Sequence, residues 1–196
     1  VVGENAAEMA IGLGADVTVL DRSPAVLDGL SKRFGGRVRT VYSTSAELEA
    51  SVLDADLVIG AVLVKGAKAP RLVTREMLSR MRDGSVLVDV AVDQGGCFET
   101  TRATTHTDPT FVVDGIVHYC VANMPGGVPR TSTVALSNAT LPFTLALAEQ
   151  GTDAALRGNP HLLNGLNVCA GVVTDRAVAD TFDLDFVDPL AALNLR

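Results

Sequence analysis

Short apolar segments alternate with amphipathic stretches along the chain as far as residue 121, and this pattern predicts strands that alternate with helices. Strands are predicted at residues 16–21, 37–42, 56–62, 86–92, 110–113 and 116–121. Helices are predicted after Gly3, from Pro24 to Phe34, from Ser45 to Leu53 and from Arg75 to Met81. Short links in the order strand, helix, strand favour an α/β fold, a Rossmann-type doubly wound parallel sheet.

The most apolar of these segments is the one from Ser85 to Gly96. Its nearly continuous valines and leucine predict a strand covered on both faces, which then leads into a loop containing Asp93. In such sheets, ligands bind beyond the carboxyl ends of the strands, so Asp93 is a candidate catalytic acid. The alternative is that Asp93 only caps or turns the chain, and its position leaves both hypotheses open.

The first residues have the pattern of the second half of a dinucleotide-binding unit. A helix opened by Gly3 precedes a strand that ends in Asp21. In the fingerprint, Gly3 would be the third glycine, and the first strand and first two glycines are expected before Val1. Asp21 would accept the hydroxyls of the adenosine ribose and repel a 2′-phosphate, which favours NAD over NADP, although Arg22 leaves room for the opposite choice. Ser23 already supplies a helix cap, so Asp21 is not needed for that role.

A break at residues 122–129, rich in glycine and proline, is the strongest predicted linker. The following stretch, 131–150, is apolar around much of its circumference, which predicts a helix buried between domains or subunits, and Pro142 predicts a kink or a split in it. Residues 152–196 are expected to form short helices and loops with no core of their own. We therefore expect a nucleotide-binding domain at 1–129 and the C-terminal helical part of a split substrate domain at 130–196.

Composition narrows the class of function. The chain has 196 residues, 47% of them hydrophobic and 20% charged, and its net charge of -7 argues against a nucleic-acid-binding surface. No apolar run is long enough to predict a membrane span. Cys97, Cys120 and Cys169 form neither a CxxC pair nor another metal-ligand pattern, so we expect no metal, no disulfide framework and a cytoplasmic location.

Several segments together resemble the C-terminal part of the family that contains alanine dehydrogenase and the NAD(P) transhydrogenase alpha subunit. They are Gly12-Leu13-Gly14-Ala15 with Val17 to Asp21, Ala55 to Val64, Gly66 to Pro70, Val92 to Glu99, and Tyr119 to Gly126. The last two are the longest and most distinctive, and Asp93-Gln94 resembles alanine dehydrogenase more than the transhydrogenase domain.

The resemblance implies roles for individual residues. Asp21 resembles the ribose-binding acid and Asp93 the acid that works at the substrate carbon. The other residues implied to line the cofactor site, together with Gly3 from the fingerprint, are Ser43, Val62, Leu63, Val90, Arg102, Val121, Ala122, Asn123 and Met124. The family's substrate-binding Arg and Lys and its catalytic His belong to a region before Val1. No His or Lys of this chain is therefore expected to inherit those roles, and the chain alone is expected to be inactive.

The implied activity is the NAD-dependent, reversible oxidative deamination of L-alanine. Hydride passes to NAD, water attacks the resulting imine, and ammonia leaves to give pyruvate. The resemblance also implies a homo-oligomer, namely a hexamer, without nucleic-acid or membrane partners. Two alternatives remain open: the NAD(H)-binding domain of a proton-translocating transhydrogenase, and a non-catalytic NAD-binding fragment.

Overall fold

A computed structural model describes residues 1–62 and 70–195. These residues form two compact units, the first ending at Met124 and the second beginning at Pro125. The boundary falls inside the predicted linker, while the assignment of nucleotide binding to 1–129 and substrate binding to 130–196 stays a prediction. Leu63, Lys65 and Lys68, for which the sequence predicts a cofactor wall and loop charges, lie outside the described residues.

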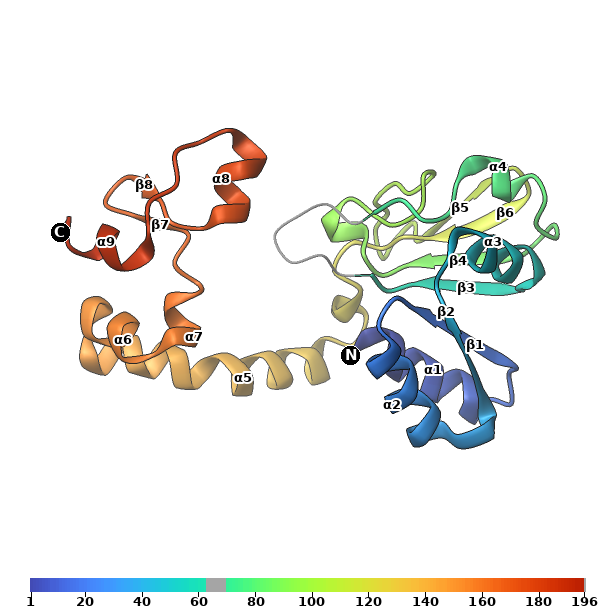
Figure 1. The fold of residues 1–196 in the computed structure, drawn as a ribbon, viewed down its shortest axis with the longest axis horizontal. Helices are drawn as coiled ribbons and strands as arrows, with labels where there is room; N and C mark the ends of the chain where they lie inside the picture. Colours follow the sequence, from blue (N-terminus) through green and yellow to red (C-terminus); the bar gives the residue numbers. More distant parts are fainter. Residues whose placement is uncertain (63–69, 196) are drawn as a thin grey trace. The chain divides into compact units, whose positions relative to one another are not determined.

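The first unit begins with two helices that pack against a pair of parallel strands (Figure 1). Helix α1 (Val2–Gly12) leads to β1 (Val17–Asp21), α2 (Pro24–Phe34), a 3-10 turn η1 (Gly35–Arg37) and β2 (Val38–Tyr42). Their apolar faces meet in a small core of Ala7, Leu30, Phe34 and Val38. The Ser23 hydroxyl caps α2 by accepting from the N–H of Val26, with Pro24 in the first turn, as the sequence predicts.

A four-stranded sheet forms the rest of this unit. It contains β3 (Leu57–Gly60), β4 (Val86–Asp89), β5 (Thr110–Val113) and β6 (Ile116–Tyr119) in the order β3-β4-β6-β5, with only β5 antiparallel. Helices α3 (Ser45–Asp54) and α4 (Arg75–Leu78) are capped by Thr44 and Thr74. The sheet and helices share a core of Val52, Val73, Leu78, Met81, Leu87, Ala91, Cys97, Phe98 and Ile116. This mixture of parallel strands and covering helices confirms the predicted α/β class.

The β1–β2 pair and the four-stranded sheet are not hydrogen-bonded to each other, whereas a doubly wound fold has a single continuous sheet. In the doubly wound strand order 3-2-1-4-5-6, one further strand would stand between β1 and β3. Consistent with this, Leu57 and Ile59 of β3 are exposed to 50% and 37%, although the sequence predicts a buried strand there. Their apolar character suits a position inside a sheet rather than at its edge.

The predicted central strand is too long. Strand β4 ends at Asp89, and the chain then turns into a 3-10 helix, η2 (Val92–Gln94), so Val90 and Val92 are not strand residues. The cause is the Asp89 side chain, whose Oδ1 accepts a hydrogen bond from the N–H of Ala91 at 3.0 Å. This local bond gives the backbone an alternative to the sheet ladder. Strand β6 likewise ends before the predicted residue 121.

The second unit starts with a 22-residue helix, α5 (Pro129–Gln150), which runs without a split through Pro142. No residue of α5 is buried within this chain, so burial of the helix between domains or subunits stays a prediction. The unit continues with α6 (Thr152–Gly158), α7 (Pro160–Leu163), β7 (Val168–Cys169), β8 (Val172–Val173), α8 (Arg176–Phe182) and α9 (Pro189–Leu193). Leu156, Cys169, Ala192 and Leu193 form a small core here, so this segment does have one, contrary to expectation.

Candidate functional site

The predicted site residues gather at the carboxyl ends of the parallel strands of the first unit. At the β1–β2 pair, Asp21 is the last residue of β1, and Ser43 directly follows β2. The N–H of Ser43 donates to the backbone oxygen of Asp21 at 3.0 Å, which holds the two residues side by side. The Asp21 carboxylate accepts from the N–H of Ser23 through Oδ1 at 2.8 Å. This bond fixes the carboxylate at the strand end, and the side chain remains only half-buried.

Gly3 lies in the first turn of α1, close to the residue that follows β3. A Cβ placed on Gly3 would lie 3.5 Å from the Cβ of Ala61. The N-terminus of α1 therefore lies at the carboxyl end of β3, where the fingerprint places a helix N-terminus. The separation is an ordinary van der Waals contact, so this packing does not in itself require glycine.

A second group of predicted residues lies at the ends of β4 and β6. The backbone N–H of Asn123 donates to Oδ2 of Asp93 at 3.4 Å, which joins the loop after β4 to the loop after β6. Asn123 has a φ of 53°, a left-handed conformation that asparagine tolerates better than most residues. Its carbonyl oxygen lies 3.1 Å from Nε2 of His106. The structure thus brings Asp93 and Asn123 together, and adds His106, which sequence reasoning left without a role.

The other residues predicted to line the cofactor site differ in how far they are buried. Val90 is half-buried, and its N–H donates to the oxygen of Gly60 at 2.9 Å. Val121 is fully buried, so no part of it is exposed to a ligand in this conformation. Ala122 and Met124 are half-buried, as is Val62 after β3.

Gln94, beside Asp93, was not predicted as a site residue. Its side-chain oxygen Oε1 is buried and has no hydrogen-bond partner among the described residues. A buried acceptor without a donor is costly, unless a ligand or water supplies one. Its signal in the sequence was weak, because a glutamine in a glycine-rich loop is usually solvated.

Asp89 was also missed, although an acid inside an apolar run is unusual. Its side chain is fully buried, and it accepts from the N–H groups of Ala91 and Cys97 and from the Thr101 hydroxyl. The Cys97 thiol lies 3.4 Å from Oδ1. Buried acids require such partners, so its place in the run was the available signal.

Arg102 stacks against an aromatic ring. Its guanidinium carbon lies 4.0 Å from the centroid of Phe111, and the same ring stacks on His118 with centroids 4.8 Å apart. Such a cation–π contact holds the exposed Arg102 in place. If Arg102 also contacts a cofactor, it does so from this stacked position.

His118 is a packed histidine within β6. Its Nδ1 lies 3.0 Å from the oxygen of Ile116, and its Nε2 lies 2.7 Å from Oγ1 of Thr100. The carbonyl assigns the proton to Nδ1, so Nε2 accepts from the threonine hydroxyl. Burial lowers the pKa of His118 below 6.5, and the charge of Arg102 lowers it further. A neutral, satisfied imidazole is not a general acid in the candidate site.

The thiols near the site are not nucleophiles. Burial raises the pKa of Cys97 to about 12, and the neighbouring charge of Asp89 acts in the same direction. Burial likewise raises the pKa of Cys120 to about 11. Both remain protonated near neutral pH, which leaves little of the reactive thiolate. Among the described residues there is no cluster of three metal-ligating side chains, and no helix has the length and apolar character needed to cross a membrane.

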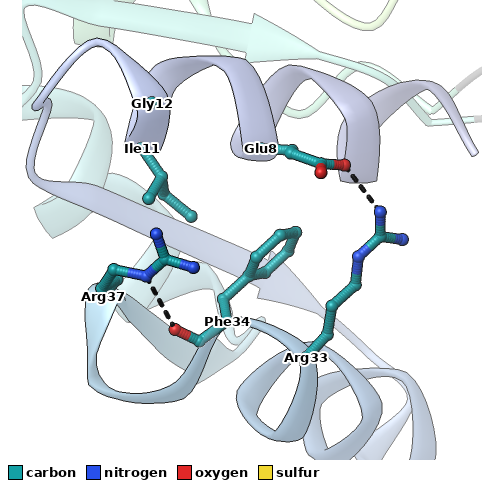
Figure 2. A pocket seen from close by; sticks show the side chains of 6 residues that line it. All are labelled: Glu8, Ile11, Gly12, Arg33, Phe34 and Arg37. Atoms are coloured by element: carbon teal, nitrogen blue, oxygen red, sulfur yellow. Dashed lines mark hydrogen bonds and ion pairs between the residues drawn. The ribbon is translucent and has the colours of Figure 1, made fainter.

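A surface pocket of about 310 Å³ lies elsewhere on the first unit (Figure 2). It is lined by Glu8, Ile11, Gly12, Arg33, Phe34 and Arg37. Arg33 pairs with Glu4 and Glu8, and Arg37 donates to the oxygen of Phe34 at 3.4 Å. The pocket lies where α1 and α2 end and β2 begins, which is the opposite end of the strand pair from Asp21. We therefore do not count it as part of the candidate site.

Comparison with known proteins supports a common origin for this arrangement. The chain is 63% identical to an alanine dehydrogenase of Halomonas elongata over 188 residues, which are 96% of this chain and 51% of that protein. A solved L-alanine dehydrogenase superposes with a TM-score of 0.83 at 53% identity, covering 93% of this chain and 50% of that one. The chain thus spans about half the length of the relatives that it matches.

A second solved structure is more distant. The transhydrogenase from Sinorhizobium meliloti superposes with a TM-score of 0.64 at 30% identity, over 75% of this chain and 42% of that one. The family model described as alanine dehydrogenase/PNT, C-terminal domain, matches residues 1–176. The chain therefore belongs to the alanine dehydrogenase/PNT family and carries its C-terminal domain.

Proposed function

We propose that this chain contains the nucleotide-binding part of an enzyme that interconverts L-alanine with pyruvate and ammonia, using NAD. The observation that carries the proposal is the contact between Asp93 and Asn123 at the ends of β4 and β6. It places an exposed carboxylate at the edge of the sheet where ligands of such folds bind. The high identity to alanine dehydrogenases supports this substrate class.

The residues present fit NAD. Asp21 presents a carboxylate at the end of β1, and only its Oδ1 takes part in a hydrogen bond among the described residues. Its other oxygen suits the hydroxyls of a ribose and opposes a 2′-phosphate. The unpaired Oε1 of Gln94 suits a ligand that brings a donor, such as the carboxamide of nicotinamide or the amino group of an amino acid. NAD, when bound, supplies the hydride acceptor.

Asp93 has the proton-transfer role in this proposal. A carboxylate within hydrogen-bond reach of the reacting carbon can take a proton from the attacking water and return it to the leaving amine. The Asn123 N–H orients Oδ2, so Oδ1 is the oxygen better placed to serve a ligand. The half-buried Met124 and Ala122 would limit the access of bulk water on the β6 side.

Family membership supports a proposal for the rest of the assembly. We propose that residues 1–129 bind NAD, that 130–196 contribute to the substrate domain, and that other parts of the enzyme supply the cationic groups that hold the substrate carboxylate. The assembly is a cytoplasmic hexamer. The exposed apolar residues of α5 support burial of this helix in a larger assembly.

The transhydrogenase alternative has weaker support. Its solved relative shares 30% identity with this chain, compared with 53% for the L-alanine dehydrogenase. The test uses the intact enzyme, expressed from its complete reading frame. NADH and pyruvate should form in equal amounts when L-alanine and NAD are supplied. Hydride exchange between NADH and an oxidised NADP analogue, with no turnover of alanine, would instead support the transhydrogenase.

A further inference from the structure

Asp89 is a fully buried acid at the end of β4, and its charge is balanced by hydrogen bonds. Oδ1 accepts from the N–H of Ala91 at 3.0 Å, and Oδ2 accepts from the N–H of Cys97 at 2.9 Å and from the Thr101 hydroxyl. None of the ion pairs found among the described residues includes it. A carboxylate in this setting depends on all of its donors, because each lost bond leaves a buried polar group unpaired.

These bonds join the two ends of one loop. Ala91 opens the loop that carries Asp93, and Cys97 closes it. Inside the loop, the oxygen of Ala91 accepts from the N–H groups of Gln94 at 2.8 Å and Gly96 at 3.1 Å. One carboxylate therefore fixes both ends of the segment, and the segment folds on itself around Ala91.

The close approach of the loop to Asp89 requires glycine at position 96. Gly96 has a φ of +76°, and a Cβ built there would lie 2.4 Å from Cγ2 and 2.6 Å from Cβ of Thr101, and 2.7 Å from Oδ2 of Asp89. Such a separation is a clash, and a side chain in this conformation would also be strained. The loop thus packs closely against both the Thr101 side chain and the Asp89 carboxylate.

We propose that Asp89 is the positioning residue of the candidate site: it clamps the loop 90–97 and thereby holds Asp93 against Asn123. It touches no substrate and acts only through the loop. This inference rests on the proposed function for its effect on catalysis, whereas the clamp itself can be tested without activity.

The test substitutes Asp89→Asn in the intact enzyme. The amide keeps the shape but turns one acceptor into a donor, so the N–H of either Ala91 or Cys97 loses its partner. Amide hydrogen exchange should rise about 10-fold or more at these two residues and stay unchanged in β5. Wild-type exchange at both amides would overturn the clamp, whatever the activity.

Kinetics then separate positioning from a general loss of stability. Asp89→Asn should lower kcat by roughly 10-fold to 100-fold, since small misplacements of a reacting group carry costs of this order, and leave the KM for NAD nearly unchanged. In an Asp93→Asn background the same change should lower kcat by less than about 2-fold, because the group that it positions is already lost. Full additivity of the two effects would overturn the proposal.

Three further variants complete the design. Val52→Ala opens the same core from α3, away from the loop, and should destabilise the enzyme while leaving kcat within about 2-fold of wild type. If Asp89→Asn does not fold, Thr101→Val removes one donor to the same carboxylate, and Thr101→Ser restores it. Thr101→Val should raise exchange at Cys97 and lower kcat, and wild-type values for both would contradict the clamp.

If Asp93→Asn alone keeps full activity, the proposed function of Asp93 fails, and the exchange result still decides the role of Asp89.

Discussion

The backbone N–H of Asn123 donates to Oδ2 of Asp93 at 3.4 Å, although the two residues follow different strands. Asp93 follows β4, and Asn123 follows β6, which pairs with β4 in parallel. The contact is long for a hydrogen bond, so it orients the carboxylate without holding it tightly. A weak hydrogen bond of this kind leaves the carboxylate available for proton exchange with a ligand.

Asn123 offers a first test, because its backbone is left-handed. Asn123→Ala should destabilise the first unit by about 1 kcal/mol, since alanine pays the steric cost of a positive φ. Asn123→Gly should be close to neutral, because glycine adopts this conformation freely. Urea unfolding of the two variants measures the difference. Equal stabilities would show that the left-handed conformation of residue 123 is not maintained in solution.

Cofactor choice tests the assignment of Asp21. The intact enzyme should bind NADH at least about 10-fold more tightly than NADPH, because the carboxylate at the end of β1 would face the 2′-phosphate. Asp21→Ala should reduce the difference between the two affinities, mainly by weakening the binding of NADH. Fluorescence titration with both nucleotides measures it, and Arg22→Ala serves as the control for the neighbouring charge. Equal affinities in the wild type would mean that Arg22 governs the site.

His118 should make the first unit sensitive to acid. Its pKa is lowered in the folded state by burial, while the unfolded chain keeps a value near 6.5. The unfolded state therefore binds the proton first, and the free energy of unfolding should fall as the pH drops below about 6.5 and on through the folded pKa. His118→Gln should flatten the dependence below about pH 6.5, and His161→Gln, at an exposed site, is the control variant. An unchanged pH dependence in His118→Gln would contradict the prediction.

The exposed face of α5 predicts self-association of the 196-residue chain. Val134, Leu136, Leu141, Phe143, Leu145 and Leu147 are all at least 36% exposed. Apolar patches of this kind bind hydrophobic dyes and promote association. Light scattering and dye fluorescence should detect both effects, and the double variant Leu136→Ser/Leu141→Ser should reduce them. A monodisperse monomer that binds no dye would refute this expectation.

The sequence predicts the elements of the first unit well, because their signals are local. Ser23 caps a helix at the predicted place, α4 begins at Arg75 as predicted, and β5 has the predicted bounds. The length of β4 escaped prediction, because valines at 90 and 92 continue the apolar pattern while the Asp89 side chain turns the backbone away. The Asp89 carboxylate also accepts a hydrogen bond from the N–H of Cys97, at the far end of the loop. Only the folded structure shows that these residues meet.

For the site, the sequence could identify the acids but not their partners. Asp21 and Asp93 stand out because acids that follow apolar strands lie at the ligand-binding edge. The meeting of Asp93 with Asn123, and the stack of Arg102, Phe111 and His118, depend on which strands are neighbours in the sheet. The apolar pattern of α5 predicts burial between domains or subunits, and the exposure of the helix within this single chain leaves that prediction open.

The most direct test of the proposed function is the kcat of Asp93→Asn in the intact enzyme. Asparagine keeps the shape and still accepts the N–H of Asn123, so folding and NAD affinity should be nearly unchanged. A residue that only capped the loop would lose a few tenths of a kcal/mol, since Asn and Asp cap about equally well. A general acid–base group should instead lose on the order of 10²-fold or more in kcat for alanine oxidation and for pyruvate amination. Full activity in both directions would show that the acid comes from elsewhere in the enzyme and that the loop after β4 is only scaffold.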